Sequence, residues 1–443
     1  MSSCPYIPPE IIQHIAHHLT HDWVDCRNNT VWRLVPGAAS YATVNKVWQD
    51  AIEREIFSEI DLRLSRLAEA DAILNGNPRR RKYVRRISLR VTPFLYYHPK
   101  PLYRQIGRLP PEFVNESRRV LQATLEGFLS VLRHWASSPA ITLHLDQGYR
   151  HRYVYFTYDP IEIEARQRII ELAPVHAITE LEMCWGEQIL SAAALCSLLA
   201  KLPALRKAKI RFQDRGLESR NELAQGLLNF THSLDELTID CCGYPRFPPY
   251  GANGWEEDRL SHALGIISQR VRVLCLCGVY LSTAVFLQPM SDPGIAHWAR
   301  LEEFRVYNPR VCSLGEHIQF LQRKYNFNDR HAEIKHLYLA AARAALEMPL
   351  LKFMTFDVYI KSRVLVPYSS LRYYRDTRAN TAKACWRSGE GFVPDAELVL
   401  AWQEVAWKHL EGKELEVEIS IDRHFFTKTH ALVSCSCPCK WPL

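Results

Sequence analysis

The stretch IPPEIIQHIAHHL, at residues 7–19, decides how the N-terminal part of this chain folds. It predicts a helix with a defined start, because proline is tolerated in the first helical turn, where its missing N–H would have no partner. Glu10 also lies in that turn, where the helix dipole favours a carboxylate. The apolar residues of the stretch recur on one stripe of the helix: Ile11, Ile12, Ile15 and Leu19.

A second stretch, YATVNKVW at residues 41–48, begins a second amphipathic helix. Its apolar residues also follow helical spacing: Val44, Val47, Trp48, Ala51, Ile52 and Ile56. Two short helices bury too little of each other to cover all these aliphatic side chains and a tryptophan. We therefore expect the pair to pack against a partner.

The two stretches together resemble the F-box, whose pattern is Leu-Pro-x-Glu-Ile, a gap and a Val-Ser-Lys-x-Trp-like box. Here Ile7 and Asn45 replace the usual leucine and serine, and the gap at 20–40 is longer than the family norm. The resemblance implies an all-helical F-box over residues 5–62 that docks onto a Skp-type adaptor of a cullin–RING ubiquitin ligase. It assigns the adaptor contact to Ile7, Pro8, Pro9, Ile11, Ile12, Ile15, Leu19, Leu34, Val44 and Trp48. The alternative is that both stretches are ordinary core helices.

Length and composition are those of a folded protein: 443 residues, 47% apolar and 23% charged, enough for two or three domains. No apolar run reaches 18 residues and the N-terminus has no secretory pattern, so we expect a cytoplasmic or nuclear protein without a membrane partner. The thirteen cysteines are scattered, several in apolar runs, which predicts buried thiols rather than disulfides. The net charge of +7 is modest, and we do not expect nucleic acid as a partner.

A helical linker is predicted over residues 63–79, with a break at Asn75-Gly-Asn-Pro78. The basic run RRRKYVRR follows at residues 79–86. Such a run can be a nuclear localisation signal or a phosphate-binding patch. It is short and has one tyrosine instead of the repeated aromatic residues that single-strand binders interleave with their basic ones, so we interpret it as a solvated linker that leads into the next strand.

Short alternating strands then recur, each separated from the next by a helical pattern: residues 87–91, 141–145, 181–183, 208–212, 237–239, 273–276, 304–306, 353–358 and 415–419. The starts at 181, 208, 237, 273 and 304 are 27, 29, 36 and 31 residues apart, at and above the range of leucine-rich repeats. We therefore predict an α/β fold: an irregular leucine-rich-repeat-like solenoid over residues 80–425, with a flexible tail at 426–443. A doubly wound α/β domain predicts the same alternation, but no glycine-rich turn follows any strand.

An F-box followed by degenerate leucine-rich repeats resembles the fungal-type F-box proteins, in which the repeats bind the protein substrate. The resemblance implies a non-catalytic substrate-recognition subunit of a Skp–cullin–F-box ubiquitin ligase that needs no cofactor. It leaves the substrate and its contact residues unknown. Two alternatives stay open: an F-box-like scaffold that acts outside the ligase, and an α/β enzyme.

Other residue clusters have two interpretations each. His14, His17, His18 and His21 include i, i+4 pairs that can bind zinc, but the His-Glu-x-x-His pattern is absent, and we interpret them as solvent-side residues of the first helix without a metal. Cys435, Cys437 and Cys439 belong either to a disordered tail or to a metal or redox site. Two aromatic-basic segments, residues 149–158 and 368–375, are candidate recognition loops or ordinary surface loops. Residues 153–158 of the first segment are also rich in aromatic and β-branched residues, which favours a strand or an extended insertion there.

Overall fold

The computed structural model divides the chain into two compact units, made mainly of residues 1–190 with 198–205, and of residues 191–197 with 206–441. The parts of the chain that the structure describes are residues 7–26, 29–35, 37–90, 111–135, 140–146, 172–183, 190–214, 216–230, 234–242, 259–286, 298–307, 310–311, 327–359, 368–388 and 392–421. Leu34 lies in a strand whose side chains are not described. Residues 149–158 and the Cys435, Cys437 and Cys439 tail lie outside the described residues.

The N-terminal part of the first unit contains the two predicted helices, α1 (Pro9–Thr20) and α2 (Lys46–Ser58), with a 3-10 helix η1 (Ala38–Thr43) between them. The chain enters α1 through prolines at its start, and the carbonyl of Pro8 accepts the first helical hydrogen bonds. Asn45 caps α2, because its side-chain oxygen accepts hydrogen bonds from the N–H groups of Val47 at 2.9 Å and Trp48 at 3.0 Å. The helices share a small core of Ile12, Ala16, Ala51 and Ile52, against which Ala42, Trp48 and Ile56 pack.

A β-hairpin follows α1, so the expectation of an all-helical N-terminal domain is wrong. Strands β1 (His21–Cys26) and β2 (Asn29–Leu34) pair antiparallel, with Trp23 opposite Trp32 and Val24 opposite Val31. The long segment between the two F-box-like stretches forms this hairpin. Its aromatic and β-branched residues suit paired strands better than a helix.

A parallel sheet completes the first unit, with strands in the order β6 (Ile178–Met183), β5 (Ile141–Asp146), β4 (Arg86–Arg90) and β3 (Glu59–Leu62). Its helices are η2 (Leu64–Arg66), α3 (Leu67–Asn75), α4 (Pro78–Arg81) and α6 (Pro111–Leu132). The predicted break at residues 75–78 is confirmed, since α3 ends at Asn75. The amide of Asn75 accepts a hydrogen bond from Trp135 Nε1 at 2.8 Å and donates one to the Val131 carbonyl at 3.1 Å, which joins α3 to the end of α6.

The first residues of the basic run, 79–81, belong to a turn of helix, α4, rather than to a solvated linker. Arg79 of α4 donates to Asp50 of α2 and to the Tyr83 hydroxyl, and Tyr83 itself donates to Asp50. Arg80 forms an ion pair with Glu53 at 2.8 Å. The hydrogen bond from Tyr83, with those of Arg79, holds the pKa of Asp50 below its ordinary value. Two of these arginines therefore anchor α2 to the segment that leads into β4.

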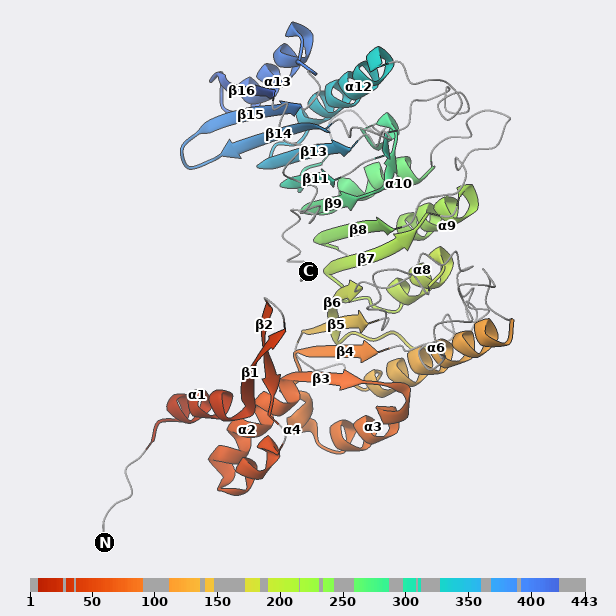
Figure 1. Ribbon diagram of the computed structural model, residues 1–443, viewed down its shortest axis with the longest axis vertical. Coiled ribbons are helices and arrows are strands. Elements are labelled where there is room, and N and C mark those ends of the chain that lie inside the picture. Colours follow the sequence, from red (N-terminus) through yellow and green to blue (C-terminus); the bar gives the residue numbers. More distant parts are fainter. Residues whose placement is uncertain are drawn as a thin grey trace. The chain divides into compact units, whose positions relative to one another are not determined.

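The second unit contains a sheet of eight described strands, in the order β16 (Leu415–Ile421), β15 (Thr381–Ser388), β14 (Tyr368–Asp376), β13 (Phe353–Tyr359), β11 (Glu303–Tyr307), β9 (Val273–Cys277), β8 (Glu236–Cys242) and β7 (Lys207–Gln213). The helices are α9 (Leu217–Leu228), α10 (Arg259–Ser268), α12 (Phe327–Ala345) and α13 (Ala396–His409), with a 3-10 helix η4 (Thr283–Phe286). Strands β10 (Tyr280–Leu281) and β12 (Arg310–Val311) form a separate short parallel pair, and α8 (Ala192–Ala200) divides between the two units. Figure 1 shows α9, α10 and α12 along one side of their strands.

The parallel strands β7, β8, β9, β11 and β13 repeat one hydrogen-bond pattern at their entries. The carbonyl of Asp235, just before β8, accepts from the N–H groups of both Arg272 and Val273 at the entry of β9. The carbonyls just before β7, β9 and β11 accept two N–H groups from the entry of the next strand in the same way: Arg206, Arg272 and Glu302. The residues at these strand entries also alternate in charge, and each forms an ion pair with the next: Lys207, Glu236, Arg272, Glu302 and Lys352. The predicted α/β alternation with a mostly parallel sheet is therefore confirmed.

Strands β14 and β15 depart from this pattern because they pair antiparallel, β14 with both β13 and β15. The segment 368–375, interpreted above as a loop, lies in β14, and that interpretation is wrong. Leu371 and Tyr373 are fully buried. Alternate residues of the segment face the core, as expected of a strand.

The sequence predicts buried cysteines and no membrane-spanning helix. Of the cysteines that the structure describes, Cys241, Cys275 and Cys385 are buried as predicted. Among the described residues, no helix is both long and apolar enough to cross a membrane.

A buried histidine joins three elements of the second unit. His409, at the end of α13, accepts a hydrogen bond at Nδ1 from the Tyr373 hydroxyl of β14 at 3.1 Å and donates from Nε2 to the Ala345 carbonyl at 3.1 Å. This arrangement uses the neutral ring, with its proton on Nε2. Burial, and then the charge of Arg375, lowers the pKa of His409 to about 4.

We predict that His409 makes the protein sensitive to acid. In the unfolded chain the ring titrates near its ordinary pKa of 6.5, so the unfolded state gains protons first and folded-state stability falls between pH 6.5 and 4, by roughly 3 kcal/mol at most. Urea unfolding at several pH values measures this slope. In His409→Gln the slope should flatten over that range, and an unchanged slope would contradict the assignment.

Candidate functional site

Five exposed apolar side chains lie on or beside the N-terminal helices. Ile7 precedes α1, Ile11 lies in α1, Tyr41 in η1, Val44 before α2 and Val47 in α2, with exposed fractions of 44, 50, 40, 63 and 48%. Five of the thirteen exposed large apolar side chains in the described residues fall within residues 7–47, and five others fall within residues 393–419. We call these five residues the exposed apolar set.

Local structure explains why these side chains stay exposed. Ile11 and Ile12 are neighbours in α1, about 100° apart around the helix axis, and only Ile12 reaches the core. The cap at Asn45 begins α2 at Lys46, so Val44 precedes the helix and Val47 lies in its first turn, ahead of the buried Ala51 and Ile52. The core is too small to cover the remaining aliphatic groups.

The ten residues assigned to adaptor contact divide by burial. Five are exposed, namely Ile7, Pro8, Pro9, Ile11 and Val44. Ile15, Leu19 and Trp48 are half-buried, Ile12 is buried in the core between the helices, and the side chain of Leu34 is outside the described part. Two exposed apolar residues, Tyr41 and Val47, were not among the ten, although both lie in the stretch 41–48.

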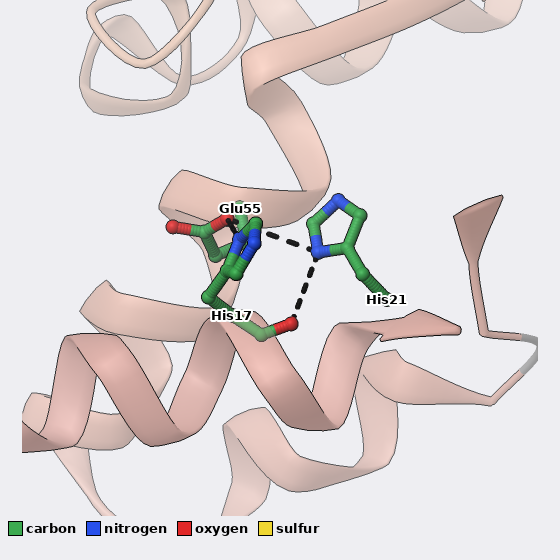
Figure 2. Close-up of side chains that lie close together, drawn as sticks. All are labelled: His17, His21 and Glu55. Atoms are coloured by element: carbon green, nitrogen blue, oxygen red, sulfur yellow. Dashed lines mark hydrogen bonds and ion pairs between the residues drawn. The ribbon is translucent and has the colours of Figure 1, made fainter. Parts of the chain in front are cut away.

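A second cluster brings His17, His21 and Glu55 together (Figure 2). His17 lies in the last turn of α1, His21 follows that helix, and Glu55 belongs to α2. The His17 Nδ1 atom lies 3.0 Å from Glu55 Oε2, and the His21 Nδ1 atom lies 4.0 Å from the same oxygen. The two imidazole rings are 4.6 Å apart between centroids.

The end of α1 places His21 in this cluster. The helix ends at the buried Thr20, whose hydroxyl donates to the Ala16 carbonyl at 2.8 Å. His21 adopts an extended backbone, and its Nδ1 atom lies 2.9 Å from the Thr20 hydroxyl and 3.1 Å from the His17 carbonyl oxygen. A carbonyl oxygen only accepts, so Nδ1 of His21 carries the proton in that contact.

The prediction that the four histidines lie on the solvent side of the first helix is confirmed for His14 and His18. His14 and His18 are exposed, with their rings 4.7 Å apart in an edge-on contact. His17 and His21 instead turn toward Glu55. The i, i+4 spacing of His17 and His21 was a signal for this pair, but nothing in the sequence placed Glu55 beside it, because that contact depends on how α1 packs on α2.

In the part of the chain that the structure describes, His17, His21 and Glu55 are the one group of at least three His, Cys, Asp or Glu side chains whose ligand atoms lie close enough to share a metal ion. The aromatic-basic segment 149–158 and the C-terminal cysteines lie outside that part. The exposed apolar set and the His17–His21–Glu55 cluster are therefore the two candidate sites, and both are on the N-terminal helices.

Residues 310–435 match a protein family described as a family of unknown function (DUF6546). The described part of the match runs from β12 through α12 and β13 to β16, and it includes the antiparallel strands β14 and β15. A comparison with curated proteins found no similar sequence. The matched range does not include either candidate site.

The exposed apolar set and the small core should respond differently to truncation. Ile52→Ala removes a fully buried side chain, and we expect a loss of about 2–5 kcal/mol in the stability of the N-terminal helices. Val44→Ala removes exposed surface and should change that stability by less than about 0.5 kcal/mol. Hydrogen exchange of the α2 amides measures both. A loss in Val44→Ala as large as in Ile52→Ala would contradict the exposed position of Val44.

Proposed function

We propose that this chain is the substrate-recognition subunit of a Skp–cullin–F-box ubiquitin ligase. Its N-terminal helices dock onto a Skp-type adaptor, and its strand–helix region binds a protein substrate. The observation that supports the proposal best is the exposed apolar set, because these side chains lie in the two stretches that resemble the F-box.

Physical chemistry supports a docking role for this set. Single exposed apolar side chains are normal, but a local concentration of them marks interaction sites. The set takes up five positions in a segment of fewer than a tenth of the residues of the chain. Fully burying a valine or isoleucine side chain contributes roughly 1.5–3 kcal/mol. The side chains of the set are 40–63% exposed, so each would contribute about half of that, and a few of them together support a stable contact.

The connection from α2 to the sheet suits a receptor that must hold its substrate in a defined place. Strand β3 begins at Glu59, directly after α2 ends at Ser58. The contacts of Arg79 and Tyr83 with Asp50, and of Arg80 with Glu53, fix the same helix to the chain before β4. A docked adaptor would therefore be connected to the first strands without a free linker, and such a receptor works by positioning.

The strands carry partly exposed polar side chains on the face that does not contribute to the core, and this supports the substrate-binding part of the proposal. In β7, Ala208, Ile210 and Phe212 are buried, and Lys209 and Arg211 alternate with them. A row of partly exposed polar side chains on parallel strands is a surface of the kind that repeat proteins use for recognition. The substrate itself stays unassigned.

Adaptor binding tests the proposal with matched variants. The full-length protein should bind a purified Skp-type adaptor with one-to-one stoichiometry in calorimetry. We expect Ile11→Asp and Val44→Asp each to weaken binding at least tenfold, because a carboxylate would be buried in an apolar contact. Leu64→Asp changes an exposed leucine outside the set and serves as the control, with binding unchanged.

Two results would contradict the proposal: no adaptor binding by the wild-type protein, or equal binding by all three variants. Co-elution with a cullin–RING assembly, in the presence of the adaptor, separates a ligase subunit from a scaffold. Adaptor binding without cullin recruitment would favour the scaffold that acts outside the ligase.

A further inference from the structure

We propose that His17, His21 and Glu55 bind one divalent transition-metal ion of the zinc class, and that this ion connects the end of α1 to α2 (Figure 2). The proposal is independent of adaptor docking, since none of the three residues belongs to the exposed apolar set. It assigns the ion a structural role on the N-terminal helices.

The donor atoms select the class of metal. Two imidazole nitrogens and one carboxylate oxygen form a donor set that zinc and neighbouring transition metals accept. Magnesium and calcium prefer oxygen ligands throughout, so this set does not suit them. His17 and His21 are four positions apart, a spacing that places two histidines one above the other near the end of a helix.

The distances are close to those of a coordinated ion. Metal–ligand bonds of about 2.0–2.1 Å in a tetrahedral site place the ligand atoms roughly 3.3–3.5 Å apart. His17 Nδ1 is 3.0 Å from Glu55 Oε2, His21 Nδ1 is 4.0 Å from the same oxygen, and the ligand atoms of all three residues lie within 4.8 Å of one another. A small rotation of the His21 ring toward Glu55 closes the site.

Ion binding requires a change in where the ring protons lie. The proton between His17 Nδ1 and Glu55 occupies the position that the ion would take. Each ring can hold its proton on Nε2 instead, which leaves the lone pair of Nδ1 for the metal. His21 then exchanges its contact with the His17 carbonyl for a bond to the ion.

Exposure allows an ion to enter and water to complete its coordination. The side chain of His17 is 41% exposed, and those of His21 and Glu55 are each 16% exposed. Water can therefore supply the fourth ligand. Because the ion contacts residues of both helices, its binding should stabilise a module whose own core is small.

Zinc titration of the full-length protein tests the site. A variant with serine at positions 435, 437 and 439 is the background, so that the C-terminal thiols do not compete for the ion. We expect one equivalent of zinc in calorimetry and a rise in melting temperature with zinc. His21→Ala and Glu55→Gln should each weaken zinc binding at least tenfold, whereas His14→Ala, on the same helix outside the site, should stay within twofold.

X-ray absorption of the zinc-loaded background protein gives a second measurement that does not depend on the folding of a variant in which one of the three ligands is replaced. We expect nitrogen and oxygen neighbours at distances typical of imidazole and carboxylate, and no sulfur. The proposal is overturned by the absence of stoichiometric zinc uptake, by sulfur among the ligands, or by equal zinc affinity of the His14→Ala and His21→Ala proteins.

Discussion

Asp50 accepts hydrogen bonds from Arg79 and Tyr83, and this contact fixes α2 to the chain that leads into the first sheet. The other faces of helix α2 make different contacts. Ala51 and Ile52 form the core with α1, Val47 stays exposed in its first turn, and Glu55 faces His17 and His21 at the end of α1 and just after it. A change in the orientation of α2 would therefore disturb the core and both candidate sites together.

The entries of the parallel strands in the second unit show how an irregular sequence keeps a regular sheet. The repeat spacing varies, yet one carbonyl before each of β7, β8, β9 and β11 accepts two N–H groups from the entry of the next strand. Alternating charges at the same positions add ion pairs between neighbours, for example Lys352 with Glu302 at 2.9 Å. Backbone hydrogen bonding thus maintains the register where side-chain identity is not repeated.

The pattern ends where β14 and β15 pair antiparallel, and this region lies inside the range that matches the family of unknown function. The buried contact of Tyr373 with His409 connects β14 to α13 there, and α13 leads on to the last strand. The C-terminal region therefore has its own core contacts, distinct from those of the repeated entries. Tyr368, Arg372 and Tyr374, which the sequence pattern indicated as loop residues, belong to strand β14.

Sequence by itself determined the helices at both ends of the F-box-like segment, the break after Asn75 and the recurring strands, because each depends on local spacing, proline and capping. Only the tertiary structure decided that Ile12 is buried and Ile11 exposed, and that Arg79 and Arg80 pair with carboxylates of α2. It also brought Glu55 to His17, across 38 residues of chain. Periodicity indicates which residues share a face of an element, but the partner of that face is chosen by packing between elements distant in sequence.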